Sequence, residues 1–257
     1  MTLETRTRIV RACFLLVALM ALALPALATQ VTLGGATATF CQAAGGGEGP
    51  WPISASIDGS FSPSNGWAIY PQVGQSQVAV YKAATDIGVV GTTGLTFNLH
   101  MLYGVGHLIG KIRLAVTTSD RGTYGLGTTC ADPNPSGSAV WIVLQPQFAI
   151  SANGQTLTVQ PDGSILASGS LPATDVVTVR AMTQLQGITG FRLEALTDSS
   201  LPFNGPGRQP TNGNFVLTEI LLDASGAPVP TLGACAMALM SLLLGIAGVL
   251  WLRSRAA

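Results

Sequence analysis

The feature that most constrains the fold is the pattern of residues 29–228, where short apolar or alternating runs are separated by turn residues. No amphipathic helix pattern of normal length stands out among them. Alternation with a period of two places successive side chains on opposite faces of a strand. The pattern therefore predicts an all-β antiparallel sandwich. The turns are Asp58-Gly59, Ser64-Asn65-Gly66, Asn153-Gly154, Pro161-Asp162-Gly163 and Asn212-Gly213.

The expected strands follow from the apolar and alternating runs between these turns. They are Ala36–Cys41, Gln77–Lys82, Leu95–Met101, Gly110–Thr117, Ala139–Gln145, Thr156–Gln160, Val176–Met182, Gly190–Leu196 and Phe215–Asp223. Two Gly-containing turns bracket one short strand and predict a meander of Phe148–Ser151, Thr156–Gln160 and Ser164–Ala167. The Pro-rich segment 132–137 is either a linker between two domains or a loop within one, and we favour a single large sandwich.

Charge and cysteine content bound the partners and the compartment. Residues 29–228 hold 7 basic and 11 acidic residues, a net charge of 7 − 11 = −4, which argues against a nucleic-acid partner. Cys41 and Cys130 are the two cysteines outside the apolar ends, and two cysteines in an oxidising compartment often pair. The sequence leaves that pairing open. No Cys/His cluster has zinc spacing, so we expect no metal site and no cofactor.

The N-terminal 28 residues have the three parts of a secretory signal. Arg6, Arg8 and Arg11 form a basic start, and the 12-residue apolar run Cys13–Leu24 is too short to span a bilayer. Small residues at Ala26 and Ala28 fit signal peptidase, so we expect cleavage after Ala28. The alternative is an uncleaved anchor helix.

The C-terminal end predicts a membrane-spanning helix. Leu232–Leu252 contains 21 residues without a charge, and Arg253 and Arg255 follow at once. Basic residues favour the cytoplasmic side, so this end is expected to stay in the cytoplasm. The arginines at the start of the signal also begin there, which places residues 29–228 outside the inner membrane. We therefore expect export through that membrane, transient anchoring by the C-terminal helix, and a final location at the cell surface or outside the cell.

A short motif stands directly before the helix, as Val229, Pro230, Thr231 and Leu232. A Pro-containing motif, an apolar helix and a basic end resemble the bacterial C-terminal sorting signals read by exosortases, in the class whose motif is Ile-Pro-Thr-Leu. Val229 replaces Ile, and Cys235 stands where that class usually has an aromatic residue. The resemblance implies that an exosortase-like membrane protease removes the tail. The alternative is an ordinary tail anchor with a chance Pro-Thr-Leu.

Two stretches of the middle resemble a known fold family. The first is Ala55-Ser56-Ile57-Asp58-Gly59 followed by Gly66-Trp67, with later strands over Leu95–Leu99 and His107–Thr117. The second runs from Ile188 to Asp223 and contains Arg192-Leu193-Glu194, Gly205-Pro206-Gly207-Arg208 and Asn212–Ile220. Both are similar to halves of discoidin-type, galactose-binding-like jelly rolls. The resemblance implies a jelly-roll sandwich and leaves the ligand open.

Most of the polar and aromatic residues in these stretches are expected to have structural roles. Trp67 is expected in the core rather than stacked on a sugar. Arg192 and Glu194 share one strand face and are expected to pair with Arg208 or Glu219 in preference to a ligand. The loop that holds Arg208 lies where jelly rolls often present binding loops, so Arg208 is the first residue to test for ligand recognition.

No catalytic constellation is visible in the sequence. His100 and His107 are the only histidines, and a lone histidine near a strand end is more often structural than catalytic. Nucleophile-elbow, zinc-protease and phosphate-loop motifs are absent, and nothing in the spacing selects a pair of carboxylates. The leading hypothesis is a non-enzymatic surface protein that binds carbohydrate, for example a surface polysaccharide. Its rivals are a purely structural matrix component and a secreted glycan-active enzyme.

Overall fold

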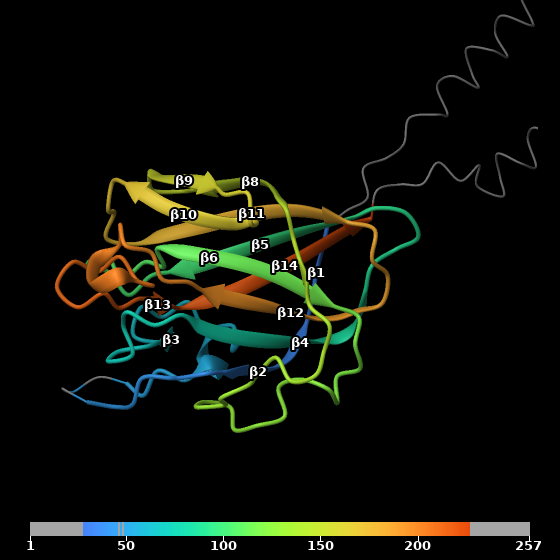
Figure 1. Ribbon diagram of the computed structural model, residues 1–257, viewed down its shortest axis with the longest axis horizontal. Helices are drawn as coiled ribbons and strands as arrows, with labels where there is room; N and C mark the ends of the chain where they lie inside the picture. The colour runs from blue at the N-terminus through green and yellow to red at the C-terminus, as the bar shows by residue number, and fades with distance from the viewer. Residues whose placement is uncertain (1–27, 46, 48, 227–257) are drawn as a thin grey trace, which may run out of the picture. The chain divides into compact units, whose positions relative to one another are not determined.

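Two antiparallel sheets face each other across a hydrophobic core in the computed structural model, which describes residues 28–226 except 46 and 48 (Figure 1). The strand β5 (Thr93–Met101) shows why these segments pair. Leu95, Phe97 and Leu99 are buried, whereas the residues between them are half-buried. A strand with one face on a core shows this alternation. The predicted all-β antiparallel sandwich is confirmed.

The first sheet, sheet A, has five strands among the described residues. Their spatial order is β1 (Thr29–Gln30), β14 (Glu219–Gly226), β5, β11 (Asp175–Thr183) and β8 (Pro146–Ser151). The pairings β14–β5 and β5–β11 are the long ones and form its centre.

The second sheet, sheet B, has seven strands in the described part of the chain. Six follow the order β2 (Leu33–Ala38), β4 (Gln77–Ile87), β12 (Ile188–Ala195), β6 (Lys111–Thr117), β10 (Ser164–Gly169) and β9 (Gln155–Val159), and β7 (Ile142–Val143) pairs with β6. A small ribbon joins β3 (Trp67–Ala68) to β13 (Val216–Leu217). The 3-10 turns are η1 (Ile53–Ser56) and η2 (Pro202–Asn204).

The chain crosses from one sheet to the other at most of its connections, and this corrects the predicted meander. β9 and β10 form the expected hairpin, but β8 pairs with β11 in the other sheet. The buried carboxylate of Asp175 explains the crossing. It accepts hydrogen bonds from the Ser151 hydroxyl, from the Gln155 side chain and from the Asn153 backbone N–H at 2.9 Å. These contacts turn the chain at Asn153-Gly154 away from sheet A.

Aromatic side chains fill the space between the sheets. Tyr81 and Phe191 stack with ring centroids 4.5 Å apart, and Phe97 meets Phe191 edge-on at 5.2 Å. All three rings are fully buried. Offset and edge-to-face pairs of this kind add to the stabilisation from burial of apolar area. The hydrophobic core of residues 28–226 thus lies between β4, β5 and β12.

A disulfide links Cys41 to Cys130, the pairing that the sequence left open. It ties the segment after β2 to the loop between β6 and β7. Residues 132–137 belong to this same loop, and residues 27–226 form one compact unit. The expected strand Ala139–Gln145 is reduced to Ile142–Val143, because residues 118–141 run as loop, which backbone hydrogen bonds of Thr129 and Asp132 tie to Ala38 at the end of β2.

Several expectations lie outside the described residues. These are the signal segment up to residue 27, the sorting motif Val229–Leu232, the apolar run Leu232–Leu252 and the terminal Arg253 and Arg255. Within residues 28–226, no helix has the length and hydropathy to cross a membrane.

Candidate functional site

A pocket of about 170 Å³ opens at the end of the sandwich that carries the β3–β13 ribbon (Figure 1). We call it the end pocket. It is formed by loops that follow β2, β3 and β5 and by the loop that leads into β13. Its lining residues are Gln42, Trp51, Tyr70, Tyr103, His107, Asn212, Asn214 and Val216.

Three aromatic rings and an imidazole shape the end pocket. Trp51 meets Tyr103 edge-on with ring centroids 5.3 Å apart, and Tyr103 meets His107 edge-on at 4.7 Å. Trp51 is almost fully buried, whereas Tyr70 is 46% exposed. The indole Nε1 of Trp51 has no hydrogen-bond partner among the described residues. A buried donor without a partner costs free energy, so this N–H is ready to donate to a bound acceptor.

Side-chain amides supply the polar part of the end pocket. The Asn214 Nδ2 donates to Gln42 Oε1 at 3.0 Å, and Asn214 Oδ1 accepts the Ile69 backbone N–H at 3.1 Å. The His107 Nδ1 lies 3.1 Å from the Gly104 carbonyl oxygen, which can only accept. In this contact Nδ1 therefore carries the proton. These bonds hold the polar groups in fixed directions.

Backbone contacts bring the loops of the end pocket together. Gln42 and Trp51 form an isolated antiparallel bridge, and the Val216 N–H donates to the His107 carbonyl at 3.0 Å. A Cβ on Gly207 would lie 2.1 Å from the Asn214 carbonyl oxygen. Glycine is therefore required at position 207 for the loop 205–208 to approach the segment that presents Asn214.

Among the residues that the structure describes, no Asp, Glu, Lys or Arg lines the end pocket, so this part of its lining has no formal charge when His107 is neutral. Sites for small neutral ligands are commonly lined by aromatic side chains together with a few fixed hydrogen-bond donors and acceptors. A polyhydroxylated ring matches both parts, since its C–H faces pack on aromatic rings and its hydroxyls bond to amides. Its described lining residues include no serine, cysteine or lysine that could act as a nucleophile beside His107.

Arg208, selected from the sequence as the first residue to test for a ligand, and Trp67, whose alternative role was stacking on a sugar, both lie outside the end pocket. Trp67 is fully buried, and its Nε1 donates to the Phe40 carbonyl at 2.8 Å, as the core interpretation expected. Arg208 is only 8% exposed, and it is not among the residues that line the end pocket.

Arg208 is instead an anchor for its loop. Its guanidinium donates to the Gln155 Oε1, to the Ser170 carbonyl and to the Gly169 carbonyl, the last two at 2.9 Å. The five donors of an arginine fork suit such a cluster of acceptors. Arg208 therefore holds the loop 205–208 against the start of β9 and the end of β10.

The expected ion-pair corner is also rearranged. Arg192 and Glu194 pair directly with each other at 3.0 Å, and Glu194 also accepts from Arg113. Neither Arg208 nor Glu219 joins them. Arg208 is held between β9 and β10, and Glu219 lies on β14 in the other sheet.

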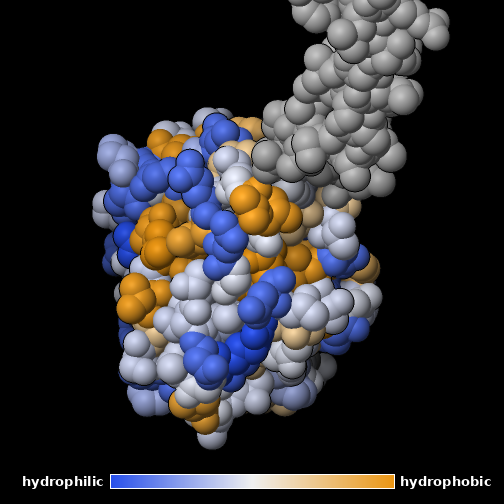
Figure 2. Space-filling view, turned by 90° about the vertical axis from the view of Figure 1, so that its right-hand side faces the viewer, coloured by the Kyte–Doolittle hydropathy of each residue, from blue (hydrophilic) through white to orange (hydrophobic). Residues whose placement is uncertain are grey.

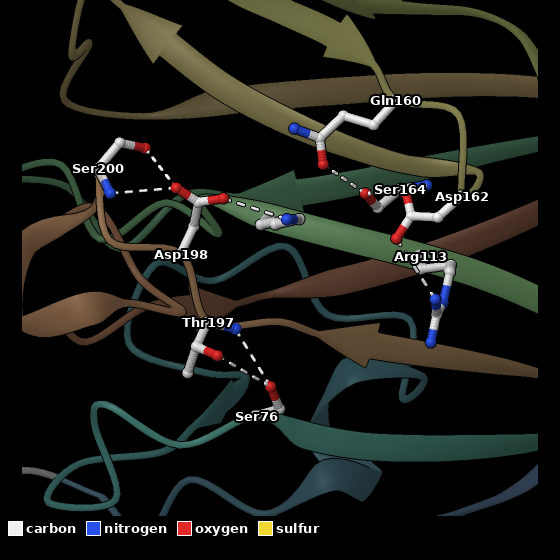
Figure 3. Close-up of polar contacts among 9 residues, drawn as sticks. Ser76, Arg113, Gln160, Asp162, Ser164, Thr197, Asp198 and Ser200 are labelled. Carbon is white, nitrogen blue, oxygen red and sulfur yellow. Dashed lines mark hydrogen bonds and ion pairs between the residues drawn. The ribbon is translucent and has the colours of Figure 1, made fainter.

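Two further acids near this corner are held by their own neighbours (Figure 3). Asp198 accepts from Ser200 and from Lys111 at 3.1 Å, and these bonds lower its pKa to about 2. Asp162 accepts from the Ser164 N–H and hydroxyl, which with Arg113 lower its pKa. Both carboxylates therefore stay ionised at neutral pH and are unsuited to donate a proton.

The opposite end of the sandwich has a different character. There β14 ends beside the start of β5, and Val89 and Val90 in the preceding loop are 43% and 71% exposed. Figure 2 shows this end, where hydrophobic side chains lie in patches between hydrophilic ones. The polar and aromatic groups of the end pocket lie at the other end of the strands.

Sequence reasoning missed Trp51, Tyr103, Gln42 and Asn214 as members of one site. Their separation along the chain explains this, since the pocket forms only when loops from both halves of the sequence meet. A usable signal was present, because Tyr103 stands in a glycine-rich loop and binding residues lie disproportionately on loops. His107 was weighed as a structural residue, and the structure places it in the pocket wall.

No known protein family model matches this chain, and no curated protein matches it. Solved structures give distant likenesses. A chain from the Streptococcus pneumoniae beta-galactosidase BgaA is 10% identical, with a TM-score of 0.44 over 76% of this chain and 98% of that one. The family 32 CBM of C. perfringens NanJ, solved with galactose, is 11% identical with a TM-score of 0.41, covering 77% and 99%. Chitosan-binding module 1 from a Paenibacillus sp. IK-5 chitosanase/glucanase is 15% identical with a TM-score of 0.31, covering 76% and 98%.

Proposed function

We propose that this chain is an exported, non-catalytic protein that binds a neutral saccharide unit in the end pocket and has a galactose-binding-like jelly-roll fold. The observation that carries the proposal is the combination within about 170 Å³ of three aromatic rings, two fixed amides and the unpartnered indole N–H of Trp51. A sugar ring can contact the aromatic rings, the amides and the indole N–H at the same time. Its C–H faces pack on the aromatic rings, and its hydroxyls both donate and accept hydrogen bonds. The small volume favours one sugar unit over an extended chain.

The placement of the termini of the sandwich supports presentation from a surface. β1 starts at Thr29, the residue that the expected signal cleavage leaves first, and it pairs with the last strand. β14 ends at Gly226, at the end of the sandwich opposite the end pocket (Figure 1). A tether that follows Gly226 would therefore join the sandwich at the end opposite the pocket.

A glycan array with the fragment 29–226 tests the binding proposal, since this fragment contains the whole core and the disulfide. Trp51→Phe keeps a ring but removes the N–H, and we expect about 3- to 10-fold weaker binding from the lost hydrogen bond. Tyr70→Ala removes a half-exposed ring, for which we expect roughly tenfold weaker binding. Phe148→Ala, which truncates an exposed ring on β8, is the matched control and should bind as wild type does.

A blank array for the wild-type fragment would remove the binding proposal and leave the purely structural matrix component. Hydrolysis of a surface polysaccharide by the fragment, abolished by a single Asp or Glu substitution, would instead favour the glycan-active enzyme. These two outcomes separate the three classes of function.

We also propose that an exosortase-like protease cleaves the chain at Val229–Leu232 after signal peptidase acts at Ala28. The motif begins beyond the last residue of β14, so removal of the tail cuts no strand of the sandwich. Mass spectrometry of the surface-associated protein tests this proposal. A mature form that still carries residues 232–257 would contradict it.

A further inference from the structure

A second, larger cavity of about 420 Å³ lies beside β14, and we call it the side cavity. Three segments line it: residues 30–33, residues 57–61 around the Asp58-Gly59 turn, and residues 219–221 at the start of β14. Val31, Leu33 and Ile57 give it apolar walls. No lysine or arginine is among its described lining residues, and the one formally charged group among them is the carboxylate of Glu219. The side cavity shares no lining residue with the end pocket.

Glu219 is 3% exposed, and its Oε2 has no hydrogen-bond partner among the described residues. The backbone N–H groups of Gly59 and Asp58 donate to this carboxylate, but burial dominates and raises the pKa of Glu219 to about 7. A buried carboxylate oxygen without a hydrogen-bond partner destabilises the fold. A ligand that brings a hydrogen-bond donor and a positive charge would remove this cost.

No protein group in the described part of the chain supplies that charge. His100 is the cross-strand neighbour of Glu219, but its ring packs edge-on against Phe61 at 4.9 Å, and burial lowers its pKa. The ion pairs of the described residues use Lys111, Arg113, Arg121 and Arg192 with other acids.

A divalent cation fits the side cavity poorly. Asp58 is the nearest second acid on the loop, but its two oxygens accept from the Ser60 N–H and from Asn65 Nδ2, each at 2.8 Å. Calcium needs six to eight oxygen ligands, and no group of three acids, histidines or cysteines gathers among the described residues. The apolar walls match a carbon skeleton rather than a bare ion.

We propose that the side cavity binds a protonated primary amine on a small carbon skeleton, with Glu219 as its counter-ion. The ammonium group donates to Oε2, and the carbon body packs on Val31, Leu33 and Ile57. The ring of Phe61, 47% exposed, offers a π face to the cation. This inference is independent of the proposed saccharide site.

Calorimetric titration of the fragment 29–226 at pH 8 tests it with two matched pairs of probes. n-Butylammonium is compared with n-butanol, and glucosamine with glucose, so that each pair differs in its amine. We expect the butylammonium ion to bind at least about tenfold more tightly than butanol, because a charge-assisted hydrogen bond to a desolvated carboxylate is added. Binding of glucosamine above glucose would identify an amino sugar as a natural source, and no difference within that pair would assign the site to alkylamines such as a lysine side chain.

Variants assign the binding to this cavity. Glu219→Gln keeps the shape and removes the charge, so the preference for the amine should fall to about one. Phe61→Ala should weaken amine binding about threefold or more, since one cation–π contact is lost. Trp51→Phe, in the end pocket, should change nothing here.

The proposal is overturned if butylammonium and butanol bind equally, or if Glu219→Gln keeps the preference. It is also overturned if Ca²⁺ binds in a Glu219-dependent manner while neither amine does. Because Trp51→Phe reports on the end pocket alone, failure of amine binding is distinguishable from failure of saccharide binding.

Discussion

The Glu219→Gln substitution should make the sandwich more stable at pH 8 while leaving it unchanged at pH 4. Burial raises the pKa of Glu219 from 4.5 to about 7 in the folded chain. Between these values the folded state holds a proton that the unfolded state has released. Stability therefore falls as pH rises through this window and is constant above it. Glutamine resembles the protonated carboxyl group and does not titrate. The free energy of unfolding of the variant therefore lacks the pH dependence that Glu219 causes in the wild type.

The magnitude follows from the same two pKa values. Each pKa unit corresponds to about 1.4 kcal/mol, so a rise from 4.5 to about 7 sets a ceiling of about 3 kcal/mol. The carboxylate borders an open cavity, and solvent screening reduces the expected gain to about 1–3 kcal/mol. The charge of Asp58 adds to the rise, and Tyr81, whose own pKa is raised by burial, does not titrate in this window.

Urea unfolding of the fragment 29–226 at intervals from pH 4 to pH 8 measures the effect. Burial lowers the pKa of His100, so its titration gives a slope of the opposite sign, but this is common to both proteins and cancels in their difference. The free energy of unfolding of the variant minus that of wild type should be near zero at pH 4 and should grow up to pH 7. Parallel curves, or a difference that shrinks toward pH 8, would refute the assignment of a buried carboxylate with a raised pKa.

Two further predictions concern the stability of the sandwich, and a third concerns cleavage of the C-terminal tail. The double change Cys41→Ser and Cys130→Ser opens a link between residues 89 apart, and in the chain-entropy model it should cost about 4–5 kcal/mol in urea unfolding. A loss below about 1 kcal/mol would contradict that model here. Arg208→Ala removes three hydrogen bonds, one of them to the buried side chain of Gln155, and should cost about 2–4 kcal/mol, whereas near-wild-type stability would show that the loop 205–208 is not anchored there. Pro230→Ala should retain full-length protein in the inner-membrane fraction on immunoblots, and normal release would argue against motif-directed cleavage.

The strands could be predicted because their information is local. In β5 and β11 the apolar residues alternate with polar ones, and the predicted ranges Leu95–Met101 and Val176–Met182 fall inside the observed strands. Sheet membership could not be predicted in the same way. β8 and β9 flank an Asn-Gly turn that is typical of a hairpin, yet the distant Asp175 pulls them into different sheets.

The candidate site was less predictable because its members come from four separate segments. Sequence reasoning ranked Arg208 for exposure in a Gly-Pro-Gly-Arg loop, since arginine is usually solvated. The burial of its guanidinium depends on acceptors near residues 155 and 170, which no local pattern reveals. Trp51 gave no periodic signal, because it lies in a loop and is buried by contacts with residues distant in sequence, among them Tyr103 and the β3–β13 ribbon.

The loop 205–208 nevertheless links the sequence prediction to the pocket, as support rather than as a ligand contact. Arg208 fixes the loop to the β9–β10 hairpin, and the loop in turn packs against Asn214 at a point where position 207 has room only for glycine. The Oδ1 of Asn214 accepts a hydrogen bond from the Ile69 backbone N–H, and its Nδ2 donates to the side chain of Gln42. A disturbance at Arg208 is thus transmitted to the end pocket through one packed layer. Weakened saccharide binding in an Arg208 variant would therefore report displacement of Asn214, and it would not show that the guanidinium touches the sugar.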